Sequence, residues 1–191
     1  MLAAMTAPPA ASTRRLAVVV MGVSGCGKST VADGIAQALG LHFIDGDRLH
    51  PEENIARMSA GIPLQDEHRW PWLDRVGACL ADAAQWPQGV AIACSALRRA
   101  YRDRLRAAMP GVRFVFLDGD AALIGRRMAL RSGHYMPEAM LASQLQTLER
   151  PGADEVDVQR LDIAMAPGEL VRCAADRLRS VRSEGPGPPA S

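Results

Sequence analysis

Residues 16–39 constrain the fold of this chain more than any other stretch. Residues 16–21 form a short apolar run rich in β-branched side chains, which indicates a buried strand. Residues 22–29, GVSGCGKS, match the phosphate-binding loop pattern G-x-x-x-x-G-K-[ST]. Helically spaced apolar side chains continue to Leu39, and Gly40 supplies a natural stop. Strand, glycine loop and helix in this order predict an α/β domain that binds a nucleotide.

Each residue type in this loop suits the binding of a triphosphate. The glycines let the backbone bring its N–H groups close to phosphate oxygens, and the helix that follows adds the positive end of its dipole. Lys28 can reach the β- and γ-phosphates, and the Ser29 hydroxyl can ligate Mg²⁺. The alternative, a glycine-rich turn that matches by chance, is disfavoured by the flanking strand and helix. The predicted ATP-binding residues of the loop are Gly22, Val23, Ser24, Gly25, Cys26, Gly27, Lys28, Ser29 and Thr30.

Lys28 is also the only lysine of the chain, so that every other basic side chain, histidines aside, is an arginine. A flexible ammonium group and a rigid guanidinium fork are not interchangeable beside a phosphate. We therefore expect Lys28 to hold the triphosphate directly.

Length and charge limit the classes of protein that the chain can be. Its 191 residues suffice for one domain, expected over residues 16–183, with disordered segments at residues 1–15 and 184–191. A net charge of +1 gives no reason to expect a nucleic-acid partner, and no apolar run approaches the ~20 residues that span a bilayer. Scattered cysteines and the lack of a signal peptide favour a cytoplasmic protein.

The rest of the chain alternates strand and helix patterns. Further strands are predicted at residues 41–44, 90–94, 112–117 and 160–165, each followed by a helical pattern. A polar turn is expected at residues 63–67, and Trp70-Pro71-Trp72 is expected to form a packed corner before a helix that starts at Leu73. Such alternation predicts a mainly parallel sheet covered by helices on both faces, which is a three-layer α/β sandwich.

Two carboxylates follow the second predicted strand. Asp45 and Asp47 flank Gly46 at the end of the sheet where parallel strands place their ligands. One could support Mg²⁺, and the other could orient an attacking hydroxyl or take its proton. The alternative is a D-G-D turn capped by its own side chains.

A cluster of basic residues lies further along the chain. Arg126, Arg127, Arg131 and His134 surround a predicted loop, and we expect a lid at residues 126–137 that closes over the phosphates. The alternative is a solvated basic helix face.

Other polar residues admit two interpretations each. Asp118 and Asp120 form a second candidate metal pair, although Asp120 is better placed to cap the next helix. Ser95 follows a strand and either contacts substrate or caps a helix. His42 and His68 lack partners at metal-ligand spacing and are expected to be structural.

With these residues assembled, the chain resembles the gluconokinase family of small-molecule kinases from about residue 16 to residue 181. The resemblance is carried by MGVSGCGKST at residues 21–30, FIDGDRLHP at residues 43–51 and CSALRRAYRD at residues 94–103. It continues in RWPWL at residues 69–73, in the lid residues, and in Ser143-Gln144 through Pro151. His68, Leu145 and Arg150 depart from the usual Asp, Phe and Glu of the family.

The resemblance implies ATP-dependent phosphorylation of the C6 hydroxyl of D-gluconate, which gives 6-phosphogluconate. It also implies Mg²⁺, a five-stranded parallel sheet in the order 2-3-1-4-5 and a homodimer. By position, Asp47 would contact the acceptor hydroxyl and Asp45 would support the metal, together with Ser29. With Lys28 and Asp47, Arg131 of the lid would be a catalytic residue, and Arg57, Arg69, Ser95 and His134 would lie along the substrate cleft. Arg127 of the basic cluster is expected to bind ATP.

Three alternative functions remain open at this point. One is a different small-molecule kinase of the same architecture, such as a shikimate kinase. Another is a nucleotide-binding switch, although the chain has no N-K-x-D-like guanine motif. The third is a kinase-like domain that has lost its activity.

Overall fold

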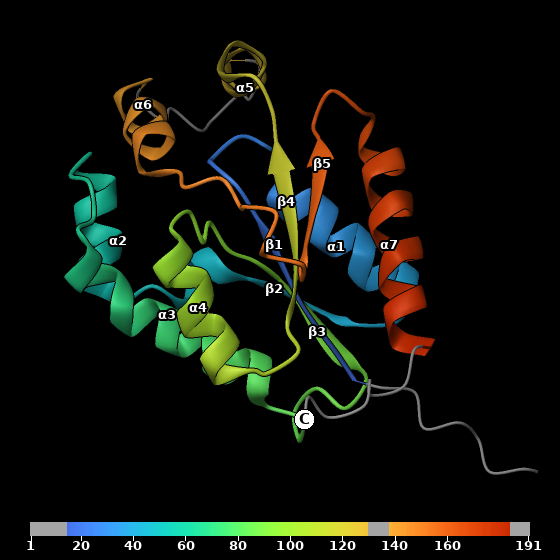
Figure 1. The fold of residues 1–191 in the computed structure, drawn as a ribbon. Coiled ribbons are helices and arrows are strands. Elements are labelled where there is room, and N and C mark those ends of the chain that lie inside the picture. The colour runs from blue at the N-terminus through green and yellow to red at the C-terminus, as the bar shows by residue number, and fades with distance from the viewer. Residues whose placement is uncertain (1–14, 130–137, 184–191) are drawn as a thin grey trace, which may run out of the picture.

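The core of the molecule is a five-stranded parallel sheet. The computed structural model describes residues 15–129 and 138–183. In order along the sheet, the strands are β2 (His42–Asp45), β3 (Gly89–Ala93), β1 (Leu16–Met21), β4 (Arg113–Asp118) and β5 (Val158–Asp162). All four pairings are parallel, and Figure 1 shows β1 at the centre. The parallel sheet and its strand order are confirmed.

Helices cover both faces of this sheet, as predicted. α1 (Lys28–Leu39) and α7 (Pro167–Ser183) pack on one face, whereas α3 (Asp66–Ala81) and α4 (Arg99–Ala108) pack on the other (Figure 1). The shorter helical elements are η1 (Gly46–Leu49), α2 (Glu52–Ser59), α5 (Ala121–Ala129) and α6 (Glu138–Thr147). Among the described residues, no helix is both long and apolar enough to cross a membrane.

β1 explains why the core has two halves. Its side chains alternate, so that Val18 and Val20 pack toward α1 and α7, while Val19 and Met21 pack toward α3 and α4. All four are almost fully buried. A strand that is buried on both faces has an uninterrupted apolar sequence, and for this reason the position of β1 could be predicted.

The strands place their carboxyl ends at one edge of the sheet. Ala93, the last residue of β3, pairs with Asp45 on one side and with Val20 on the other. The phosphate-loop pattern, the D-G-D segment and Ser95 therefore leave the sheet side by side. α5 and α6 lie beyond the same edge (Figure 1).

The corner expected at residues 70–72 is wrong, and the turn expected at residues 63–67 ends two residues early, because α3 already begins at Asp66. The Gln65 N–H donates to His68 Nδ1 at 3.1 Å and supports the first turn. Burial of Trp72 and Leu73 outweighs the backbone hydrogen bond that Pro71 removes inside the helix. β5 also begins at Val158, two residues earlier than predicted.

A buried ion pair ties α4 to the segment that precedes β5. Arg102 donates from Nε and Nη2 to the two carboxylate oxygens of Glu155 at 2.7 and 2.6 Å, and both side chains are almost fully buried. Arg102 Nη1 also donates to the carbonyl oxygens of Ala96, Leu97 and Glu149. The pair thereby fixes the loop that carries Ser95.

Replacing Glu155 with glutamine will destabilise the fold by about 3 kcal/mol, because a buried guanidinium loses its counter-charge. Hydrogen bonds from Arg102 lower the pKa of Glu155 from 4.5 to about 2. The pair is therefore fully stabilising above pH 4.5, and its contribution is lost as the pH falls from there toward 2. Urea unfolding of the wild type and of Glu155→Gln between pH 7 and pH 3 will measure their free energies of unfolding. The difference between the two free energies will become smaller as the pH falls.

Asp74→Asn provides the control, since the Asp74–Arg104 pair is exposed. That substitution will cost at most about 1 kcal/mol. An equal loss of unfolding free energy in the two variants would show that the buried pair stabilises the fold no more than an exposed pair does.

Candidate functional site

The glycine loop between β1 and α1 has the backbone conformation that close approach requires. Gly22 has φ 141°, and a Cβ there would lie 2.7 Å from the Leu117 carbonyl oxygen, so only glycine fits. Its N–H donates to the Ser95 carbonyl oxygen at 3.3 Å. Among the described side chains, none caps the first turn of α1, which begins at Lys28. The free N–H groups of that turn form a site for an anion.

Lys28 holds its ammonium group above this loop. Its Nζ donates to the Val23 carbonyl oxygen at 3.0 Å, and the side chain lines a cleft between the loop and the D-G-D segment. The predicted place for a phosphate-binding cation is therefore occupied by the single lysine.

The D-G-D segment is pinned by its glycine. A Cβ on Gly46 would lie 2.4 Å from the Ala93 carbonyl oxygen, and the Gly46 carbonyl accepts a hydrogen bond from Trp72 Nε1 at 2.7 Å. Asp45 Oδ1 accepts from the Asp47 N–H at 3.2 Å, so the self-capped turn that the sequence suggested is present. Capping by Asp45 leaves the Asp47 side chain in the cleft with Lys28.

The cleft is lined by both polar and apolar side chains, and it encloses about 90 Å³. Its polar lining consists of Ser24, Lys28, Asp47, His50, Arg69, Ser95, Ser143 and Gln144. Its apolar lining consists of Met58, Ile62, Pro63 and Leu64. A lining that combines apolar side chains with a few charged groups is typical of a small-molecule site.

Burial determines the charge states in the cleft. It raises the pKa of Asp47 above 3.8, Lys28 opposes that rise, and Asp45 adds to it. Burial, with help from the charge of Arg69, lowers the pKa of His50 to about 4, so His50 is neutral at pH 7. The cleft then presents Lys28 and Arg69 as cations and Asp47 as an acceptor of protons.

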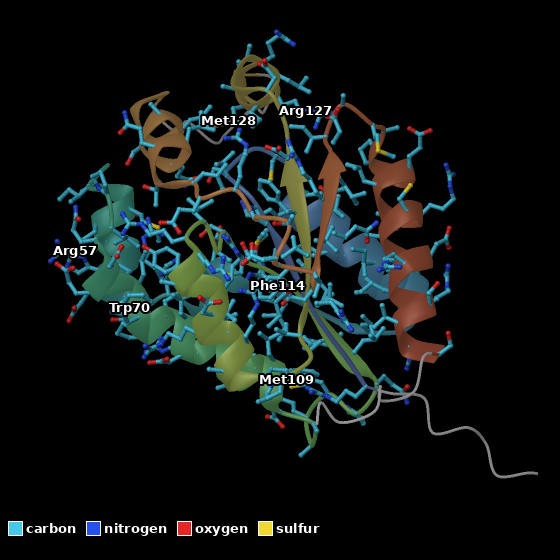
Figure 2. All side chains as sticks on the ribbon, in the orientation of Figure 1. Arg57, Trp70, Met109, Phe114, Arg127 and Met128 are labelled. Carbon is cyan, nitrogen blue, oxygen red and sulfur yellow. The ribbon has the colours of Figure 1, made fainter. Side chains whose placement is uncertain are left out.

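The structure separates the two arginines expected along the substrate cleft. Arg69 lines the cleft, and its Nε donates to the Leu64 carbonyl oxygen at 3.4 Å. Arg57 is exposed on α2, and Figure 2 shows it on the outer side of that helix. Ser95 lines the cleft beside Asp47, whereas Arg98 is the N-cap residue of α4, so Ser95 does not cap that helix.

α5 packs against the glycine loop. A Cβ on Gly25 would lie 2.5 Å from Met128 Cγ, and Arg127 donates to the Ile163 carbonyl oxygen at 2.7 Å. Figure 2 shows Arg127 between the ends of β4 and β5 and Met128 on the side of the loop. Arg131 and His134, and with them the centre of the expected lid, lie outside the described residues.

The second candidate metal pair is used in other contacts. Asp118 forms ion pairs with Arg150 and Arg160, and Asp120 Oδ1 caps α5 by accepting from the Ala122 N–H at 2.6 Å. His42 stacks on Trp86, as expected for a structural histidine. Across residues 15–129 and 138–183, no group of three or more His, Cys, Asp or Glu side chains could hold a metal.

The sequence analysis did not predict roles for Gln144 and His50 in the cleft. Both lie in segments quoted for the family resemblance, yet neither residue type indicates phosphate chemistry. Only the packing of α6 and η1 brings these two side chains to the site.

Comparisons with known proteins give one consistent result. A family model described as an AAA domain matches residues 18–151. The thermosensitive gluconokinase of Escherichia coli (strain K12) is 49% identical over 145 residues, which cover 76% of this chain and 78% of that protein. The crystal structure of a gluconokinase from Sinorhizobium meliloti 1021 is 48% identical, with a TM-score of 0.80, and the match covers 88% of this chain and 95% of that one.

The fold extends to more distant proteins. A shikimate kinase from Aquifex aeolicus has a TM-score of 0.51 at 14% identity, over 89% of this chain and 100% of that one. At that identity, the likeness shows the fold alone.

Proposed function

The chain belongs to the gluconokinase family, and we propose that it transfers the terminal phosphoryl group of ATP to the C6 hydroxyl of D-gluconate, giving 6-phospho-D-gluconate. One observation carries the proposal. Lys28, a cation of the phosphate loop, and Asp47, a carboxylate, line the same cleft, which also contains Arg69. Phosphoryl transfer to an anionic alcohol needs these three groups.

The glycine loop fits the triphosphate, and the chemistry of two oxygen groups suits Mg²⁺. The uncapped first turn of α1 and Lys28 would hold the β- and γ-phosphates. The Ser29 hydroxyl and the Asp45 carboxylate are hard oxygen ligands, and we propose that they hold Mg²⁺ directly or through water. When bound, Mg²⁺ would neutralise charge on the phosphates.

The chain's own residues then position the acceptor. Asp47 accepts a hydrogen bond from the C6 hydroxyl and takes its proton as the bond from that oxygen to the γ-phosphorus forms. The bond from the γ-phosphorus to the bridging oxygen breaks, and ADP leaves. Lys28 stabilises the charge that spreads over the transferred group. Arg127 as an ATP ligand, Arg131 as a catalytic residue and His134 as a substrate ligand belong to the same proposal.

A panel assay tests the function. With ATP and Mg²⁺, we expect D-gluconate to stimulate ADP release and to be preferred over other sugar acids and over shikimate. Comparable turnover of shikimate would favour a different small-molecule kinase. ADP release at a rate that does not depend on any acceptor would favour a nucleotide-binding switch.

Replacing Arg69 with alanine will raise the KM for gluconate by about 10- to 100-fold, because a charge-assisted hydrogen bond to the substrate carboxylate is worth about 1.5–3 kcal/mol. The KM for ATP will change by less than about twofold in the same variant. Steady-state rates with each substrate varied in turn will measure both. Arg57→Ala is the matched control, since Arg57 is exposed on α2. An equal rise in the KM for gluconate in both variants would contradict the assignment of Arg69.

We further propose, from the family resemblance, that the enzyme is a cytoplasmic homodimer without nucleic-acid or membrane partners. Sedimentation of the purified protein tests the dimer.

A further inference from the structure

Gln144 joins α6 to the phosphate loop at a distance of 120 residues along the chain. Its Oε1 accepts a hydrogen bond from the Ser24 backbone N–H at 2.6 Å. Its Nε2 donates to Ser24 Oγ at 3.3 Å. Both polar atoms of the side chain therefore contact one residue of the loop.

The Ser24 N–H belongs to the set of backbone donors that a phosphate loop turns toward an anion. Gln144 Oε1 carries partial negative charge, so it accepts here in the manner of a phosphate oxygen. Ser24 lines the same cleft as Lys28 and Asp47, the two side chains that the proposed function assigns to the transferred phosphoryl group and the acceptor hydroxyl. The amide oxygen of Gln144 thus satisfies a backbone donor of the phosphate loop at the cleft that Lys28 and Asp47 also line.

We infer that Gln144 distinguishes ATP from ADP at this loop, an inference that rests on the proposed function because it requires a nucleotide bound there. With ADP, the γ-phosphate position stays empty and Gln144 keeps its contact with Ser24. With ATP, Oε1 gives up the Ser24 N–H, and Nε2 donates to a γ-phosphate oxygen. α6 therefore contacts the loop through the amide in one state and through the γ-phosphate in the other.

The neutrality of the side chain is essential to this exchange. A glutamine can accept from Ser24 and can then donate to a phosphate oxygen, whereas a glutamate can only accept. In a Gln144→Glu variant the carboxylate would keep the Ser24 N–H and would be attracted by Lys28. It would then repel an incoming γ-phosphate.

Calorimetric titration with ADP and with the non-hydrolysable ATP analogue AMPPNP, without gluconate, tests the inference. In Gln144→Glu, we expect AMPPNP to bind at least about tenfold more weakly, and ADP to bind within about threefold of the wild type. Gln144→Leu removes the hydrogen bonds without adding charge, and we expect a smaller loss, again for AMPPNP only. Gln146→Glu is the matched control, because Gln146 is exposed on the same helix.

Equal weakening of both nucleotides in Gln144→Glu would overturn the inference, since a merely structural contact does not distinguish them. Unchanged AMPPNP binding, or the same loss in Gln146→Glu, would also overturn it. A wild-type protein that binds AMPPNP but does not phosphorylate gluconate would instead overturn the proposed function and leave the role of Gln144 standing.

Discussion

Replacing Lys28 with alanine will lower kcat for gluconate phosphorylation by at least about a thousandfold. The Lys28 ammonium group is the cation that the phosphate loop itself supplies to the cleft, and no other lysine in the chain could replace it. Its Nζ lies 3.0 Å from the Val23 carbonyl oxygen, so the charge is already held above the loop and needs little reorganisation to meet a phosphate. Coupled-enzyme measurement of ADP release at saturating ATP and gluconate gives kcat directly.

Lys28→Arg separates charge from shape. A guanidinium keeps the positive charge, but its planar fork is larger than an ammonium group and cannot take the same position against the Val23 carbonyl oxygen. We therefore expect most of the loss to persist in this variant. A thermal unfolding midpoint close to that of the wild type will show that both variants are folded. Unchanged turnover in Lys28→Ala would contradict the assignment of this loop as the ATP site and would favour a domain without kinase activity.

The parts of the fold that could be predicted are those whose signals are local. β1 is an uninterrupted apolar run because it is buried on both faces, and the glycine loop after it has residue types that phosphate chemistry requires. These two features predict the first strand and the first helix. The alternating strand and helix patterns that follow predict the three layers of the α/β sandwich. The shared edge of the sheet then follows from parallel pairing alone, and it brings Asp47 to Lys28.

The parts that could not be predicted depend on tertiary contacts. Pro71 indicated a corner, yet the burial of Trp72 and its hydrogen bond to Gly46 keep the segment helical. Nothing in the residue types of Arg57 and Arg69 says which of them turns into the cleft. Gln144 is an ordinary helix residue until α6 packs on the loop.

Replacing Asp47 with asparagine will lower kcat by about 10²- to 10⁴-fold, because an amide cannot take the proton of the acceptor hydroxyl. The amide keeps the shape of the carboxylate and a hydrogen-bonding oxygen, so the KM for gluconate will change little by comparison. Asp45→Asn is the comparison variant, since Asp45 caps the Asp47 N–H and does not line the cleft. A similar loss of kcat in both variants, with unchanged response to Mg²⁺, would contradict separate roles for the two carboxylates.

The pH dependence follows from the same carboxylate. Desolvation raises the pKa of Asp47 above 3.8, against the lowering effect of Lys28, so the group is protonated at a higher pH than a free aspartate. Protonated Asp47 cannot act as a base, and kcat/KM for gluconate must therefore fall as the pH decreases through this raised value. His50 stays neutral down to about pH 4 and adds no second step near neutrality. A profile of kcat/KM from pH 4 to pH 9 will show one acidic limb in the wild type, and Asp47→Asn will remove it. An acidic limb that survives in the variant would assign the base to another residue.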